Sequence, residues 1–62
     1  MKLRIEIDDL GGGACTATLE QFQQLTGGLL TNDEIAAIAM GETIVTETDE
    51  GVTVQVEKDR KN

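Results

Sequence analysis

The chain has 62 residues, a net charge of −7, one cysteine and no histidine. A chain this short holds one domain, residues 1–62, and buries only about 60% of the surface that its unfolded form exposes. The composition excludes an intramolecular disulfide, a Ser-His-Asp or Cys-His nucleophile and a zinc site rich in cysteine and histidine. We therefore expect no enzyme activity, no cofactor and no bound metal.

The first predicted element is a strand over residues 2–8. Apolar and charged side chains alternate there, which is typical of a half-buried strand with Leu3, Ile5 and Ile7 facing inward. The run Gly11-Gly12-Gly13 ends the alternation. We interpret the segment from this run to Thr16 as a loop leading to a helix.

The first helix is predicted over residues 18–26. Thr18 and Gln21 have the spacing of a capping box, in which the two residues satisfy each other's main-chain donors. Gly27-Gly28 is a typical helix stop. The residues expected to face the core are Leu19, Phe22, Leu25 and Thr26.

A second capping box, Thr31 with Glu34, predicts a helix that continues through Met40 and ends at Gly41. Two acidic residues in its first turn suit the positive end of the helix dipole. The residues expected to face the core are Ile35, Ile38 and Ala39.

The remainder predicts a hairpin of residues 43–48 and 52–58, rich in Thr, Val and Ile. A two-residue turn would bury the carboxylate of Glu47. A three-residue turn with Gly51 in the left-handed conformation keeps Glu47 outside, so we favour that register. It places Thr46 opposite Val54 and Ile44 opposite Val56.

These elements predict an α+β fold of two layers, β-α-α-β-β. We expect a three-stranded antiparallel sheet in order 1-3-2, with two short helices on one face and residues 52–58 in the centre. In this arrangement Leu3, Ile5 and Ile7 face Val56, Val54 and Val52. A parallel pairing of residues 2–8 with 43–48 is the competing topology. Residues 59–62 are interpreted as a frayed tail.

Charge is unevenly distributed along the chain. All five cations lie within four residues of an end, whereas eleven of the twelve acids lie between Glu6 and Glu57. Such a surface repels nucleic-acid phosphates and suits a protein partner with a basic surface. The sequence has no apolar run of membrane-spanning or signal-peptide length, and a lone thiol suits a reducing compartment. We therefore expect a cytoplasmic protein without membrane contact.

Two groups of residues are candidate sites. The partner-binding candidates are acids in turns and at a helix start, together with the outer side of the second helix: Asp33, Glu34, Ala37, Met40, Glu47, Asp49 and Glu50. The glycine run Gly11, Gly12 and Gly13 is a weaker candidate for a small ligand, since it lacks the Lys-Ser/Thr pair of a P-loop and lies beside Asp8-Asp9.

The uncovered face of the predicted sheet offers another surface. It holds threonines and charges of both signs: Lys2, Arg4, Glu6, Thr43, Val45, Glu47, Thr53, Gln55 and Glu57. This composition favours a solvated face. The outer strands, 2–8 and 43–48, could also accept a strand from another chain.

Our leading hypothesis is a small acidic protein-binding module, an inhibitor or adaptor that occupies a site on a larger partner. A phage-type antagonist of a host nucleic-acid or defence enzyme is one form that such a module takes. The alternatives are a homo-oligomeric structural component, in its simplest form a homodimer, and a small-ligand binder using residues Gly11 to Thr16.

Overall fold

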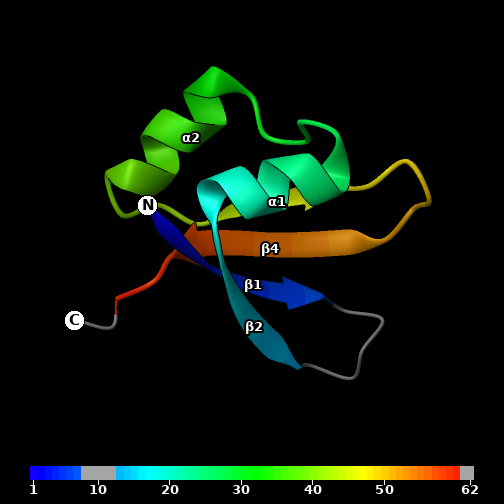
Figure 1. Cartoon of the computed structure of the whole chain (residues 1–62), viewed down its shortest axis with the longest axis horizontal. Coiled ribbons are helices and arrows are strands. Elements are labelled where there is room, and N and C mark those ends of the chain that lie inside the picture. The colour runs from blue at the N-terminus through cyan, green and yellow to red at the C-terminus, as the bar shows by residue number, and fades with distance from the viewer. Residues whose placement is uncertain (8–12, 61–62) are drawn as a thin grey trace.

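The computed structural model describes residues 1–7 and 13–60 of the chain. Within these ranges the elements in chain order are β1 (Lys2–Ile7), β2 (Ala14–Thr18), α1 (Leu19–Thr26), α2 (Asn32–Ala39), β3 (Ile44–Glu47) and β4 (Thr53–Lys58). Both helices lie on the same face of the sheet, which gives an α+β domain of two layers (Figure 1).

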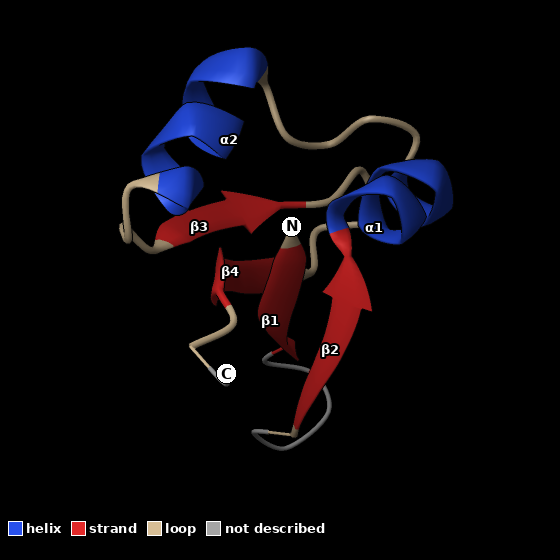
Figure 2. Cartoon of the chain, turned by 60° about the vertical axis from the view of Figure 1, so that its left-hand side comes forward, coloured by secondary structure: helices blue, strands red, loops and turns tan. Residues whose placement is uncertain are grey.

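The sheet has four antiparallel strands in the order β2-β1-β4-β3 (Figure 2). The predicted three-stranded sheet in order 1-3-2 is therefore wrong. Residues Ala14–Thr18, which we interpreted as a loop and a helix cap, run back beside β1, with Thr18 opposite Lys2 and Ala14 opposite Glu6. Consequently β1 is an interior strand, and the two edges of the sheet are β2 and β3.

The pairing of β1 with β4 differs from the predicted register by two residues. Ile5 lies opposite Val56 and Ile7 opposite Val54, whereas the sequence placed Leu3 opposite Val56. A shift of two keeps every side chain on its own face, so the apolar pattern alone could not exclude it. The competing parallel topology is also wrong, because β1 pairs with β4 and not with β3.

The hairpin register is confirmed. Thr46 lies opposite Val54 and Ile44 opposite Val56, and Gly51 has a φ of 84°. Both capping boxes are confirmed as well. The Thr18 hydroxyl accepts from the Gln21 N–H at 3.1 Å, and the Thr31 hydroxyl accepts from the Glu34 N–H at 3.2 Å.

Two residues assigned to the inner helix faces lie outside. Leu25 is 85% exposed, and Ala39 is exposed. An α-helix turns by about 100° per residue, so the buried stripe of α1 runs through Leu19, Phe22 and Thr26 and leaves Leu25 on its flank. The same spacing puts Ala39 beside, and not within, the stripe centred on Ile38.

The core lies between the helices and the two middle strands. Its buried members come from β1, α1, the loop before α2, α2 and β4: Leu3, Ile5, Phe22, Leu30, Ile38, Val54 and Val56. No buried polar side-chain atom among the described residues lacks a hydrogen-bond partner. The sheet and helices thus share one apolar core whose polar neighbours are hydrogen-bonded.

Candidate partner-binding site

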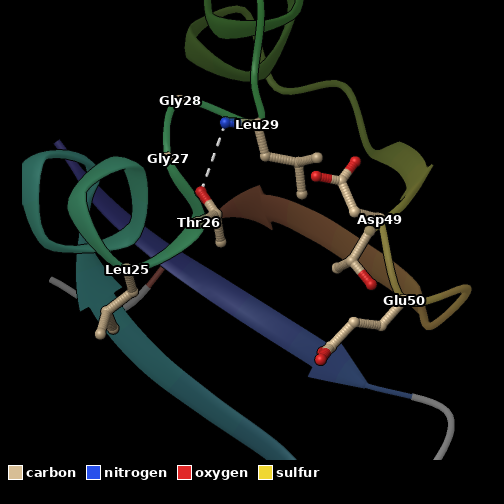
Figure 3. A pocket seen from close by; sticks show the side chains of 8 residues that line it. Leu25, Thr26, Gly27, Gly28, Leu29, Asp49 and Glu50 are labelled. Atoms are coloured by element: carbon tan, nitrogen blue, oxygen red, sulfur yellow. Dashed lines mark hydrogen bonds between the residues drawn. The ribbon is translucent and has the colours of Figure 1, made fainter.

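A pocket of about 520 Å³ lies between the C-terminal end of α1 and the turn that joins β3 to β4 (Figure 3). We call it the hairpin pocket. One wall is the end of α1 with the loop after it, and the other is the hairpin turn. The lining residues are Leu25, Thr26, Gly27, Gly28, Leu29, Thr48, Asp49 and Glu50. This lining carries two carboxylates and no cation.

The α1 wall is the negative end of a helix. Gly27 caps α1 with a φ of 70°, and the N–H groups of Gly27 and Gly28 both donate to the Gln23 carbonyl. Gly28 also has a positive φ, 83°. This type of helix C-cap requires a left-handed backbone conformation, which glycine adopts without steric cost. The last turn of α1 has no basic residue, so the partial negative charge of its carbonyls is not offset from within the helix.

A threonine fixes the loop that leaves α1. The Thr26 hydroxyl donates to the Phe22 carbonyl at 2.8 Å and accepts from the Leu29 N–H at 3.3 Å (Figure 3). These bonds place the half-buried Leu29 side chain on the pocket wall. The wall thus combines the apolar surface of Leu25 and Leu29 with the negative end of the helix.

The opposite wall is held by Thr48. Its carbonyl accepts from the Gly51 N–H at 2.9 Å, and its hydroxyl accepts from the Val52 N–H at 3.2 Å. The turn therefore has a fixed geometry, and the two acids at its tip, Asp49 and Glu50, are exposed. In Figure 3 the Asp49 side chain extends across the pocket toward Leu29.

The other predicted partner-binding residues lie elsewhere. Asp33 is exposed in the first turn of α2, but the Glu34 carboxylate accepts from the Thr31 N–H at 2.9 Å and closes the capping box. Ala37 is half-buried, while Met40, just after α2, is 82% exposed. Figure 1 shows α2 and the β3–β4 turn at opposite ends of the domain, so these residues do not share a surface with the hairpin pocket.

Glu47 lies on the face of the sheet that the helices leave open. It is exposed and pairs in register with Thr53. Elsewhere on this face, Arg4 Nη1 donates to Glu6 Oε1 at 2.6 Å and to Glu57 Oε2 at 3.0 Å. The hydrogen bond to Glu6 is the main cause of a raised pKa of the Arg4 guanidinium. The charges at the centre of this face are therefore paired with one another.

The glycine run leads into a strand and not into a helix. Gly11 and Gly12 lie outside the described residues, and Gly13 is exposed. Because β2 separates Gly13 from the start of α1 at Leu19, the run does not adjoin a helix N-terminus. The expected helix start therefore does not follow the run directly, and the small-ligand hypothesis itself stays a prediction.

The structure adds residues that the sequence interpretation did not select. Gly27 and Gly28 were recognised only as a helix stop, yet they form half of the pocket wall together with Leu25 and Leu29. The available signal was the absence of a basic residue near this stop. The absence of a basic residue indicates a site only once the structure shows that Asp49 and Glu50 lie across the pocket from this helix end.

Across residues 1–7 and 13–60, no three acidic, cysteine or histidine side chains gather closely enough to hold a metal ion. Neither described helix is long and apolar enough to cross a membrane. Comparison with protein-family models, with curated proteins and with solved structures finds no match to this chain.

Proposed function

We propose that the chain is a small protein-binding module, and that its hairpin pocket receives an arginine or lysine side chain from a basic surface of a larger partner. The observation that carries this proposal is the convergence of two sources of negative potential. The C-terminal end of α1, which has no basic residue in its last turn, faces the Asp49-Glu50 turn across one pocket.

A long cationic side chain fits both the chemistry and the shape of this pocket. Its aliphatic stem can lie against the apolar surface of Leu25 and Leu29, while its charged head reaches carboxylates and helix-end carbonyls. Arginine suits the site better than lysine, since its planar guanidinium offers several donors in fixed directions. We therefore expect arginine to bind more tightly.

The wider field supports the same partner. The net charge of −7 attracts a basic surface and speeds the encounter, and it disfavours nucleic acid and anionic membranes. Arg4 does not weaken this field near the pocket, because it is paired with Glu6 and Glu57 on the open sheet face. An inhibitor or adaptor is the form of module that we favour, including a phage-type antagonist of a host nucleic-acid or defence enzyme.

We further propose that the module acts in the cytoplasm and by binding, without catalysis. Cys15 is a free and exposed thiol, which suits a reducing compartment. The hairpin pocket has carboxylates but no imidazole, amine or thiol to work beside them as a second catalytic group. Detection of substrate turnover by the purified chain would contradict this part of the proposal.

A nuclear magnetic resonance titration tests the pocket directly. N-acetyl-arginine amide is added to the ¹⁵N-labelled chain, and the neutral N-acetyl-citrulline amide serves as the control ligand. We expect shifts with the arginine compound at Gly27, Gly28, Asp49 and Glu50 that weaken with added salt. Equal shifts with both compounds, or shifts confined to other residues, would reject the pocket.

Matched variants test the partner. The double variant Asp49→Asn/Glu50→Gln and the single variant Glu42→Lys change the net charge by the same amount, but Glu42 lies outside the pocket. Retention of partners from a lysate is compared for both, in rising salt. We expect loss only for the pocket variant. An equal loss for the two would show that net charge, and not the pocket, governs the interaction.

A further inference from the structure

Within residues 1–7 and 13–60, one edge of the sheet lacks the protection that edge strands normally have. β2 consists of Ala14-Cys15-Thr16-Ala17-Thr18, without charge or proline, and no described strand pairs with its outer side. The opposite edge, β3, is shorter and ends in Glu47. Natural proteins usually guard an edge with charges, proline, a bulge or a covering segment, because bare main-chain groups pair readily with another strand.

The hydrogen-bond pattern shows which main-chain groups of β2 point outward. The Leu19 N–H donates to the Met1 carbonyl at 2.8 Å, one step beyond the Lys2–Thr18 pair. Hydrogen-bonded pairs alternate along an antiparallel ladder, so β2 bonds to β1 through Ala17 and Cys15. The N–H and C=O groups of Ala14 and Thr16 therefore face away from the sheet.

Thr18 takes no part in this outward row. Its N–H donates to the Gln21 side chain at 3.1 Å. As the cap residue of α1, it also offers its carbonyl to the first helical hydrogen bond. Two donors and two acceptors thus remain on the outer edge, arranged symmetrically on either side of Cys15.

We propose that the chain forms a two-fold homodimer in which β2 pairs antiparallel with β2 of a second copy, with Cys15 on the two-fold axis. Ala14 of each copy then lies opposite Thr16 of the other, and all four outward groups of each strand are bonded. A register centred on Thr16 would bond only the Thr16 groups, since Thr18 is already used. The symmetric edge is thus complementary to itself.

The surroundings of β2 also favour a second copy over the basic partner proposed above. A neighbouring pocket on the helix side is lined by the uncharged residues Ala17, Gln21, Gln24 and Leu25. A basic partner gains nothing electrostatic from this surface. Two acidic copies repel least where they meet through an uncharged strand.

Pairing at this edge makes one continuous eight-stranded sheet. Leu25 lines both the hairpin pocket and the pocket beside β2, but the acidic wall of the hairpin pocket, Asp49 and Glu50, lies away from the paired edge. In Figure 2 α2 lies over β3, whereas β2 forms the other edge of the sheet, and the β3–β4 turn belongs to the β3 edge. The dimer therefore presents two acidic pockets to the surroundings. It does not depend on the proposed function, and either can fail alone.

Sedimentation equilibrium under reducing conditions is the first test. We expect a dimer whose population rises with added salt, because salt screens the repulsion between two chains of net charge −7. Binding of a basic partner should weaken with salt, so the two associations are distinguishable by the sign of this dependence. A chain that stays monomeric at millimolar concentration would overturn the proposal.

Two proline variants locate the interface. Thr16→Pro removes an outward N–H of β2, and Val45→Pro removes an outward N–H of β3, as the Thr46–Val54 pairing implies. Circular dichroism checks that both variants fold. We expect only Thr16→Pro to abolish the dimer. Equal dimer populations in the two would reject β2 as the interface.

Cys15 reports the register. A non-hydrogen-bonded pair brings opposite Cα atoms to about 4.5 Å, within the range of a disulfide. Diamide removes two electrons and two protons from the paired thiols to form the cross-link. We expect the wild-type chain to cross-link about tenfold faster than Cys15→Ala/Ala36→Cys, whose thiol lies on an exposed helix position. Cys15→Ser should remain dimeric. Equal cross-linking rates would contradict the register centred on Cys15. A monomeric Cys15→Ser variant would show that the dimer depends on the thiol and not on strand pairing.

Discussion

Gln23 and Leu30 are joined by two hydrogen bonds that span the connection between the helices. The Gln23 Nε2 donates to the Leu30 carbonyl at 2.9 Å, and the Leu30 N–H donates to the Gln23 Oε1 at 3.1 Å. One side-chain amide thus satisfies both main-chain groups of a residue whose own side chain is only 3% exposed. The loop that it closes contains Gly27 and Gly28, so this pair also shapes the hairpin pocket.

Replacing Gln23 with alanine should destabilise the domain by about 1–3 kcal/mol, because two partly buried main-chain groups lose their partner. Gln24→Ala is the matched control, since Gln24 is exposed on the same helix. Urea denaturation measures both. Hydrogen exchange at Gly27 and Gly28 should also speed up in Gln23→Ala alone. Equal stability of the two variants would show that the amide bridge contributes nothing.

Phe22 and Leu25 form a second matched pair on α1. Phe22 is 5% exposed and packs in the core, whereas Leu25 is 85% exposed. Phe22→Ala should cost about 3–5 kcal/mol, which for a domain this small means an unfolded chain at room temperature. Leu25→Ala should change the stability by less than about 0.5 kcal/mol. Thermal denaturation followed by circular dichroism distinguishes them, and a folded Phe22→Ala would contradict the proposed core.

Much of the fold was predictable from short-range signals. The two capping boxes and the hairpin register involve residues within a few positions of each other, and each was confirmed. β2 was missed because its burial is slight: only Ala17 is half-buried, and the other four residues are exposed. An edge strand of Ala, Cys and Thr has no apolar alternation to detect. The β-branched residues Thr16 and Thr18 were the remaining signal.

The candidate site was less predictable than the fold. Asp49 and Glu50 were selected from the sequence only because they are acidic. Other acids were selected on the same ground, but the fold places them far from the pocket or, in the case of Glu34, uses the carboxylate to cap a helix. The second half of the hairpin pocket comes from Gly27 and Gly28, about 20 positions earlier in the chain. A pocket built from two distant turns requires the tertiary arrangement, and no local pattern contains it.

The cap of α2 allows a test by a conservative change. Thr31→Ala removes the hydroxyl that accepts from the Glu34 N–H and should cost about 1 kcal/mol. Thr31→Ser keeps the hydroxyl and should retain most of the stability. Urea denaturation of the two variants gives the comparison. If serine proves as damaging as alanine, the methyl group of Thr31 matters and the cap does not.

Gly51 holds the turn that presents Asp49 and Glu50. Its φ is 84°, and an added Cβ would meet no atom within 4 Å, so a substitution there carries only a conformational cost. Gly51→Ala should destabilise the domain by about 1–2 kcal/mol, because L-residues disfavour the left-handed region. Gly51→Asn should cost less, since asparagine visits that region more readily.

A chain of this length is accessible to chemical synthesis, which allows a sharper control at the same position. D-alanine adds the same methyl group as L-alanine but prefers a positive φ. It should therefore leave the stability unchanged or raise it slightly, because it also restricts the unfolded chain. Urea denaturation of the two synthetic proteins separates handedness from bulk. If D-alanine and L-alanine destabilise equally, the left-handed turn at Gly51 is wrong, and so is the placement of the acidic wall of the hairpin pocket.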